Sequence, residues 1–157
     1  MMTAEASTLV HAPLAVVRDA VLDPDAYARG DTKVARVSVI ERTAEGMLAR
    51  IHGHLGPFHS SILARYTVHD RRVDLEMLEG RLRGFDAGFW LDEEGDQVRL
   101  THREHYDFGY GPLSPILDRV LRGWATRSVV AEVEALRRAA EERAATLNTA
   151  AGAATED

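Results

Sequence analysis

Three side chains capable of acid–base chemistry occur at every second position of a strand-like stretch: His102, Glu104 and Tyr106. Alternate residues of a β-strand point to the same face, so this spacing places the three side chains together. The preceding residues of that face, Val98 and Leu100, are apolar. Imidazole, carboxylate and phenol groups directed into an apolar interior are unusual. The row is therefore the first candidate for a functional site.

Arg83 joins this row when its own strand, 81–92, is paired with the strand 97–108 that carries the row. The pairing that places Leu91 opposite Val98 matches apolar residues with apolar residues, as a correct register should. The same pairing puts Ala87 opposite His102, which leaves room beside the imidazole. Arg83 then lies opposite Tyr106 and diagonal to Glu104.

The elements that must hold these residues follow from the hydrophobic periodicity of the chain. A period of two residues, interrupted by short turn-like breaks, predicts antiparallel strands. After the first strand, two short helices begin at Pro13 and Pro24, because proline is well tolerated in a first helical turn. The expected strands are 4–10, 33–42, 47–55, 58–68, 72–78, 81–92 and 97–108.

The residues from 112 to about 146 are expected to form one long helix. Apolar residues there recur at helical spacing and form a stripe that includes Leu121 and Trp124, whereas most charged residues, Glu132 among them, are assigned to other faces. Such a helix needs a broad apolar surface, which the strands can supply. The sequence therefore predicts an α+β fold in which a curved seven-stranded antiparallel sheet packs on this helix.

A second group of candidate side chains consists of His52, His54 and His59. Pairing Leu55 with Phe58 makes one face of this hairpin apolar and places His54 opposite His59 on the other face. Three histidines at this spacing resemble a zinc site. Because that face is the solvent side and offers no carboxylate or cysteine, we interpret the histidines as ordinary surface residues and predict no metal.

Composition limits the classes of function. The chain has 157 residues, no cysteine and a net charge of −6, which favours one domain over 1–147 and argues against general binding to nucleic acids or anionic membranes. No apolar run reaches the roughly 18 residues of a membrane span, and a cytoplasmic location is expected. The residues 148–157 are predicted to form a disordered acidic tail. The oligomeric state is left open, with a homodimer among the alternatives.

The order of elements, together with several short motifs, resembles the START-like helix-grip superfamily, also called SRPBCC, and within it the polyketide cyclase/dehydrase-like group. The motifs are Val-His-Ala-Pro at 10–13, Leu-Asp-Pro-Asp-Ala-Tyr at 22–27, and the strand at 98–102 that leads into the long helix. The resemblance spans roughly 6–140. It implies a deep cavity between sheet and helix that holds an apolar small molecule.

This resemblance gives the polar row a chemical interpretation. Polyketide cyclisation removes a proton from carbon between two carbonyls and stabilises the resulting enolate. On this hypothesis His102 is a general base or acid oriented by Glu104, while Arg83 and Tyr106 hold a substrate carbonyl. The alternative is structural: Arg83 and Glu104 form a buried ion pair, and His102 is a satisfied core residue.

The ligand would be enclosed by apolar walls. Trp124 is expected to floor the cavity, and Arg81 is expected at its mouth, where it would bind an anionic group or simply be solvated. The remaining predicted ligand contacts are Tyr66, Met77, Phe85 and Phe89. The chain has no phosphate-binding glycine loop or nucleophile motif, so we predict a cofactor-independent cyclase- or dehydrase-like enzyme. The alternatives are a non-catalytic lipid or metabolite carrier and a partner-binding module.

Overall fold

The computed structural model, which describes residues 1–30, 33–55, 58–109 and 111–153, contains a seven-stranded antiparallel sheet packed against one long helix. The strand order is β1-β7-β6-β5-β4-β3-β2. The elements in chain order are β1 (Met2–Val10), α1 (Leu14–Val21), α2 (Pro24–Gly30), β2 (Val34–Thr43), β3 (Gly46–Leu55), β4 (Phe58–Val68), β5 (Arg72–Glu79), β6 (Gly84–Glu94), β7 (Gln97–Asp107), the short 3-10 helix η1 (Gly111–Leu113) and α3 (Ser114–Ala153). The predicted fold class and element order are confirmed.

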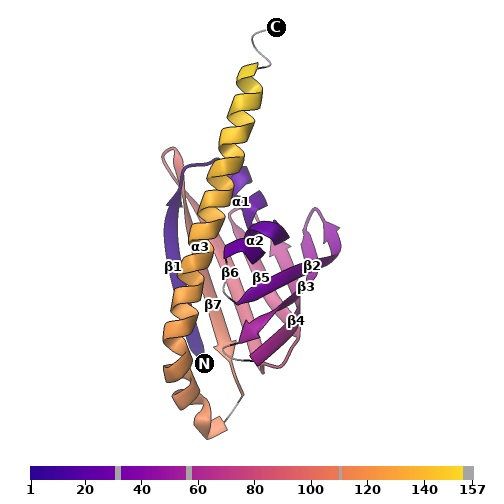
Figure 1. Ribbon diagram of the computed structural model, residues 1–157, viewed down its shortest axis with the longest axis vertical. Helices are drawn as coiled ribbons and strands as arrows, with labels where there is room; N and C mark the ends of the chain where they lie inside the picture. The colour runs from indigo at the N-terminus through magenta and orange to yellow at the C-terminus, as the bar shows by residue number, and fades with distance from the viewer. Residues whose placement is uncertain (31–32, 56–57, 110, 154–157) are drawn as a thin grey trace.

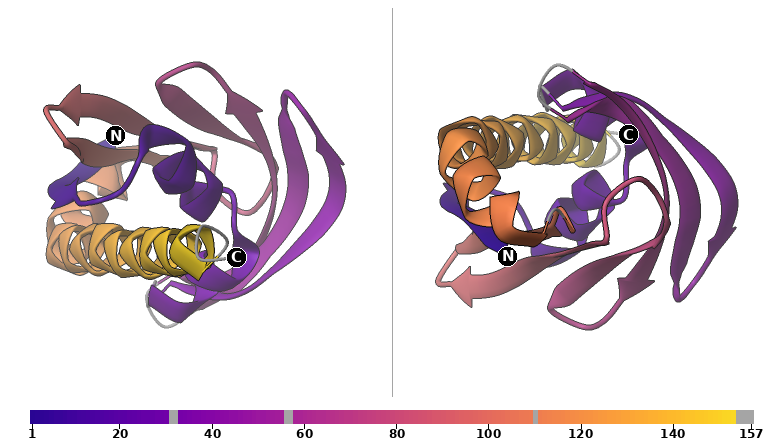
Figure 2. Two further views of the ribbon diagram at one scale, coloured as in Figure 1. Left: turned by 90° about the horizontal axis from the view of Figure 1, so that it is seen from above. Right: turned by 90° about the horizontal axis from the view of Figure 1, so that it is seen from below.

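The sheet curves, and α3 lies across its open side (Figures 1 and 2). Two apolar clusters fill the interface. The larger joins α1 and the C-terminal half of α3 to the sheet, whereas the smaller joins β1, the end of β7 and the first half of α3. In the described part of the chain, no helix has an apolar stretch long enough to cross a membrane.

Strand registers were predicted correctly for one hairpin and wrongly for another. In β3–β4, Leu55 pairs with Phe58 and His54 with His59, as expected. In β6–β7, Leu91 pairs with Leu100 rather than Val98. The cause is the turn: Gly95, at φ +66°, and the residue after it form a tight two-residue turn. A shift of two residues keeps every side chain on its predicted face but changes its neighbour.

The long helix differs from its prediction at both ends. It begins at Ser114, after η1, and it continues to Ala153. The predicted tail is therefore helical up to that residue, while 154–157 lie outside the described residues. Alanine-rich sequence explains the extension, because alanine has the highest helix propensity and adding residues to an existing helix costs little.

Gly53 in β3 permits the close approach of the chain that precedes β2. A Cβ atom at this position would lie 1.7 Å from the carbonyl oxygen of Lys33. That oxygen accepts a hydrogen bond from the backbone N–H of His54 at 2.7 Å. Gly53 is thus required to place Lys33 where the structure has it.

We expect Gly53→Ala to lower the free energy of unfolding by about 1–3 kcal/mol, because the methyl group overpacks this contact. Urea unfolding followed by circular dichroism measures the loss. Gly84→Ala is the matched control: a Cβ there would meet only Asp107, at an ordinary 3.6 Å. Equal stability of the two variants would contradict the proposed role of Gly53.

Candidate functional site

The inner face of β7 carries the predicted polar row. Burial alternates along this strand, and the side chains of His102, Glu104 and Tyr106 are all buried. They face α3 rather than solvent. The prediction that these three residues point into the interior is confirmed.

His102 is held in one orientation. Its Nδ1 lies 3.0 Å from the carbonyl oxygen of Gly88, and because a carbonyl can only accept, Nδ1 carries a proton. Phe89 stacks on the imidazole with ring centroids 3.9 Å apart. The predicted neighbour was Ala87, with room beside the ring. The two-residue register shift puts Phe89 there instead, so the space is filled.

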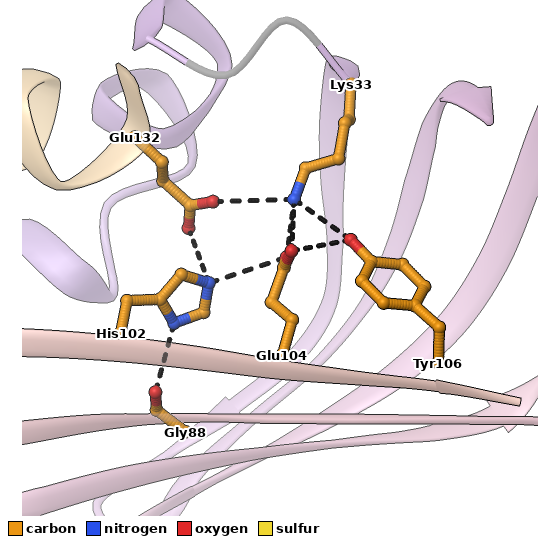
Figure 3. Close-up of polar contacts among 6 residues, drawn as sticks. All are labelled: Lys33, Gly88, His102, Glu104, Tyr106 and Glu132. Atoms are coloured by element: carbon orange, nitrogen blue, oxygen red, sulfur yellow. Dashed lines mark hydrogen bonds and ion pairs between the residues drawn. The ribbon is translucent and has the colours of Figure 1, made fainter. Parts of the chain in front are cut away.

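Two residues from other elements complete a cluster of buried charges (Figure 3). Glu132 of α3 is 1% exposed, and its Oε1 lies 3.3 Å from Nε2 of His102. Lys33, the residue just before β2, places its Nζ 2.5 Å and 2.6 Å from the two carboxylate oxygens of Glu104. Neither oxygen of Glu132 makes a hydrogen bond among the described residues, so its charge is met by ion pairs alone.

The opposite charges stabilise each other's ionised forms. Burial would lower the pKa of His102, but Glu132 and Glu104 outweigh it and raise this pKa to about 10. Burial would raise the pKa of Glu104, but Lys33 and His102 outweigh it and lower this pKa to about 2. Lys33, His102, Glu104 and Glu132, hereafter the charge cluster, thus pair two basic with two acidic side chains.

Tyr106 connects the charge cluster to the rest of the interior. Its hydroxyl donates to Oε2 of Glu104 at 2.5 Å and lies 3.3 Å from Nζ of Lys33. Burial first, and then the Glu104 charge, raise the pKa of Tyr106 well above its usual value. The phenol therefore remains protonated and can act as a hydrogen-bond donor.

The charge cluster also contains the donor types of a metal site. One ligand atom each from His102, Glu104 and Glu132 lie within 4.8 Å of one another. A histidine whose second nitrogen donates to a backbone carbonyl is common among metal ligands. Here the ammonium of Lys33 lies against Glu104 and 3.8 Å from Glu132. Lys33 therefore already supplies, beside both carboxylates, the kind of positive charge that a metal ion would bring.

A cavity of about 80 Å³ adjoins the charge cluster on the side of Lys33, Glu104 and Tyr106. Its other lining residues are mostly apolar: Val34, Ile51, Ile62, Leu75, Leu82 and Phe85, with Gly53, His54 and Ser60 completing the lining. This volume is below the roughly 300 Å³ of common ligand pockets. A drug-sized ligand therefore requires lining side chains to move.

Comparison with known proteins identifies the architecture. No protein-family profile and no curated protein matches the chain, but solved structures do. The Zhui aromatase/cyclase from Streptomyces sp. R1128 superposes with a TM-score of 0.72 at 20% identity, over 90% of this chain and 94% of that one. The protein has a START-like helix-grip fold.

Two further solved structures with this fold show how broad it is. A START superfamily protein from Mycobacterium smegmatis has a TM-score of 0.68 at 14% identity, covering 94% of this chain and 99% of that one. A STAR-related lipid transfer protein from Xanthomonas axonopodis has a TM-score of 0.71 at 14% identity, covering 87% and 84%. At these identities the likeness concerns the fold alone.

Within the helix-grip fold, the two predicted arginines lie outside the cavity. Arg83 precedes β6, its side chain is 75% exposed, and its Nε is 3.6 Å from Asp107. The predicted pairing with Tyr106, and hence the ion pair with Glu104, was wrong because of the register shift. Arg81 is exposed and lines a separate surface groove with the three outer histidines.

The predicted apolar contacts of the helix-grip cavity divide into lining and core residues. Phe85 lines the cavity. Trp124 is half-buried in the smaller apolar cluster rather than on the cavity floor, because the buried face of α3 runs through Ala125 and Val129 instead. Tyr66 and Phe89 are core residues, and Met77 is half-buried; none of the three lines the cavity.

The outer histidines lie on the solvent face of the helix-grip sheet, as predicted. The rings of His54 and His59 are 4.5 Å apart. In the part of the chain that the structure describes, the three donors that come together are those of the buried cluster, not those of this face.

Sequence reasoning missed Lys33 and Glu132. At about 100° per residue, Glu132 lies about 60° from Leu117, inside the apolar stripe rather than outside it. That position was a usable signal for burial. Lys33 gave no such signal: it stands at the first position of a predicted strand, where a lysine is ordinarily solvated.

Proposed function

We propose that the protein binds a small, largely apolar molecule with a carbonyl oxygen in the cavity, and catalyses its cyclisation or dehydration by acid–base chemistry. One observation carries this proposal: an apolar cavity ends on Lys33, Glu104 and Tyr106. A ligand there would bury its hydrocarbon part and direct its oxygen to an ammonium and a phenol. Solved aromatase/cyclase structures with the same fold support it as analogy only.

The proposed reaction begins with proton transfer to Glu104. When the ligand oxygen takes the hydrogen bonds of Lys33 and Tyr106, Glu104 loses the Lys33 hydrogen bonds that help to lower its pKa. The carboxylate then takes a proton from the carbon next to the ligand carbonyl, while Lys33 and Tyr106 stabilise the enolate oxygen. In a cyclisation, the enolate carbon then bonds to a second carbonyl carbon, whose oxygen receives the proton from Glu104. In a dehydration, a β-hydroxyl leaves as water with the proton from Glu104.

His102 acts through Glu104, because it does not line the cavity. With a pKa near 10 it is protonated at neutral pH, which favours the acid role over the base role. Its positive charge keeps Glu104 ionised between turnovers, and it can return a proton to that carboxylate. His102 is thus a positioning residue.

The homodimer, the cytoplasmic location and the lack of nucleic-acid binding stay predictions.

A second candidate is a non-catalytic carrier. The observation that favours it is that the polar groups already satisfy one another: Glu104 accepts hydrogen bonds from both Lys33 and Tyr106. A network that only neutralises buried charge would leave a ligand chemically unchanged. Binding without proton transfer distinguishes the carrier from the enzyme.

Proton exchange in acetophenone tests the catalytic part. In deuterated buffer, we expect the protein to accelerate exchange of the methyl protons, and Glu104→Gln to reduce this acceleration by about 100- to 10,000-fold, since a general base is lost. Proton NMR measures both rates. Tyr106→Phe, which keeps all four charges, should weaken exchange without loss of fold.

Arg83→Gln is the matched control, because Arg83 is exposed, and it should leave exchange unchanged. If the wild-type protein does not accelerate exchange but acetophenone produces saturable shifts at Leu75 and Phe85, the carrier is the correct reading. If neither effect occurs with acetophenone or a longer aryl ketone, ligand binding in this cavity is also wrong.

A further inference from the structure

The first turns of α3 expose apolar side chains that the sheet does not cover. Leu113 at the end of η1 is 58% exposed, and Ile116 and Val120 of α3 are 62% and 70% exposed. Residues three or four positions apart lie on one side of a helix. The three side chains therefore form one apolar surface, which we call the α3 face.

Positive charge accompanies the α3 face. Arg119 and Arg127 lie three and seven residues from its apolar members and are exposed. Between 112 and 131 the sequence has a single acidic residue, Asp118, and its carboxylate pairs with the amino group of Met1 at 3.4 Å. The net charge of −6 thus describes the whole chain but not this surface.

The α3 face adjoins the wall of the cavity. Leu82 lines the cavity, and it also packs in the smaller apolar cluster with Leu121 and Trp124 of α3. These turns of α3 are packed on the side of Leu121 and Trp124 and exposed on the side of Ile116 and Val120. The α3 face therefore belongs to the same turns of α3 that pack, through the smaller apolar cluster, with a residue of the cavity wall.

We propose that the α3 face docks on anionic lipid bilayers. A helix side that combines bulky apolar residues with arginines fits the interface of such a membrane, where acyl chains receive the apolar groups and lipid phosphates the guanidinium groups. A second copy of this chain fits less well. In a symmetric contact the same surface meets itself, which would bring arginines together with no exposed acid to pair them.

Vesicle co-sedimentation tests the docking. We expect the protein to bind vesicles of phosphatidylcholine with phosphatidylglycerol more tightly than vesicles of phosphatidylcholine alone, and added salt to reduce the difference. Arg119→Gln with Arg127→Gln should weaken binding to the anionic vesicles roughly 10- to 30-fold. Ile116→Ser with Val120→Ser should weaken binding to both kinds of vesicle.

The controls change the same residue types at the far edge of the sheet. Ile40 on β2 is 57% exposed, and Arg36 on the same strand is exposed, so Ile40→Ser with Arg36→Gln should leave binding unchanged. Equal binding by all variants, or no binding by the wild type, would overturn the proposal. So would a wild-type dimer in light scattering that becomes monomeric in the Ile116/Val120 variant, because the face would then be a contact between copies. None of these outcomes bears on ligand binding in the cavity.

Discussion

Lys33→Met should lower the free energy of unfolding by about 3–5 kcal/mol, the usual cost of removing one partner from a buried ion pair. The substitution keeps most of the side-chain volume but removes the ammonium, which lies 2.5 Å from Glu104 and 3.8 Å from Glu132. The charge cluster is then left with two carboxylates and one cation, away from water. Chemical denaturation at neutral pH measures the loss.

The double variant Lys33→Met/Glu104→Gln distinguishes charge balance from packing. It again leaves equal numbers of positive and negative groups, so we expect it to recover part of the lost stability. Arg50→Met is the matched single control: Arg50 pairs with Glu79 at 3.1 Å on the protein surface, where an ion pair contributes about 0–1 kcal/mol. A double variant less stable than Lys33→Met would show that the hydrogen bonds of Glu104, not charge balance, dominate.

The sequence was sufficient to predict the fold because the relevant signals are repeated along the chain. Alternating apolar and polar residues in seven strands, together with one apolar stripe on a long helix, leave few ways to pack the sheet and the helix. The register of β3–β4 was predictable because a shift by one residue would have turned Ile51 and Ala49 to the solvent. The β6–β7 register was not, since a shift by two residues preserves the faces.

That two-residue shift explains most of the difference at the candidate site. It moved Phe89 onto His102 and left Arg83 outside, where it meets Asp107. The interior row itself was predictable, because alternation alone places His102 on the inner face. The partners of the row come from distant positions, 71 residues away for Lys33, and no local pattern indicates which charge meets which across the interior.

Glu132 shows a different limit. Its angular position indicated burial, yet a glutamate inside an apolar stripe is ordinarily read as the edge of the stripe. His102 already has a carboxylate neighbour on its own strand, Glu104, so its placement in the interior gave no reason to expect a second carboxylate from α3. The buried charges are therefore coupled: each is acceptable only because the others are present.

The pH dependence of stability should reveal this coupling through His102. Its pKa is raised to about 10 in the folded protein, above the ordinary value near 6.5. The stabilising contribution is therefore complete below about pH 6.5 and is lost as the pH rises through about 10. Glu104 contributes at the acidic end of the pH range. Its pKa is lowered to about 2, so its contribution to stability is present above about pH 4.5 and is lost on acidification.

We expect stability to fall from about pH 7 to about pH 9.5 with a slope of up to about 1.4 kcal/mol per pH unit, since the folded state holds one proton that the unfolded state releases. His102→Gln should be less stable at neutral pH and should lack this slope, because glutamine does not titrate. The control His105→Gln removes an exposed histidine that contacts Thr3 on the outer side of β7, and it should keep the slope. Parallel profiles for wild type and His102→Gln would mean that His102 is neutral in the folded protein, in which case the two carboxylates beside it must share a proton.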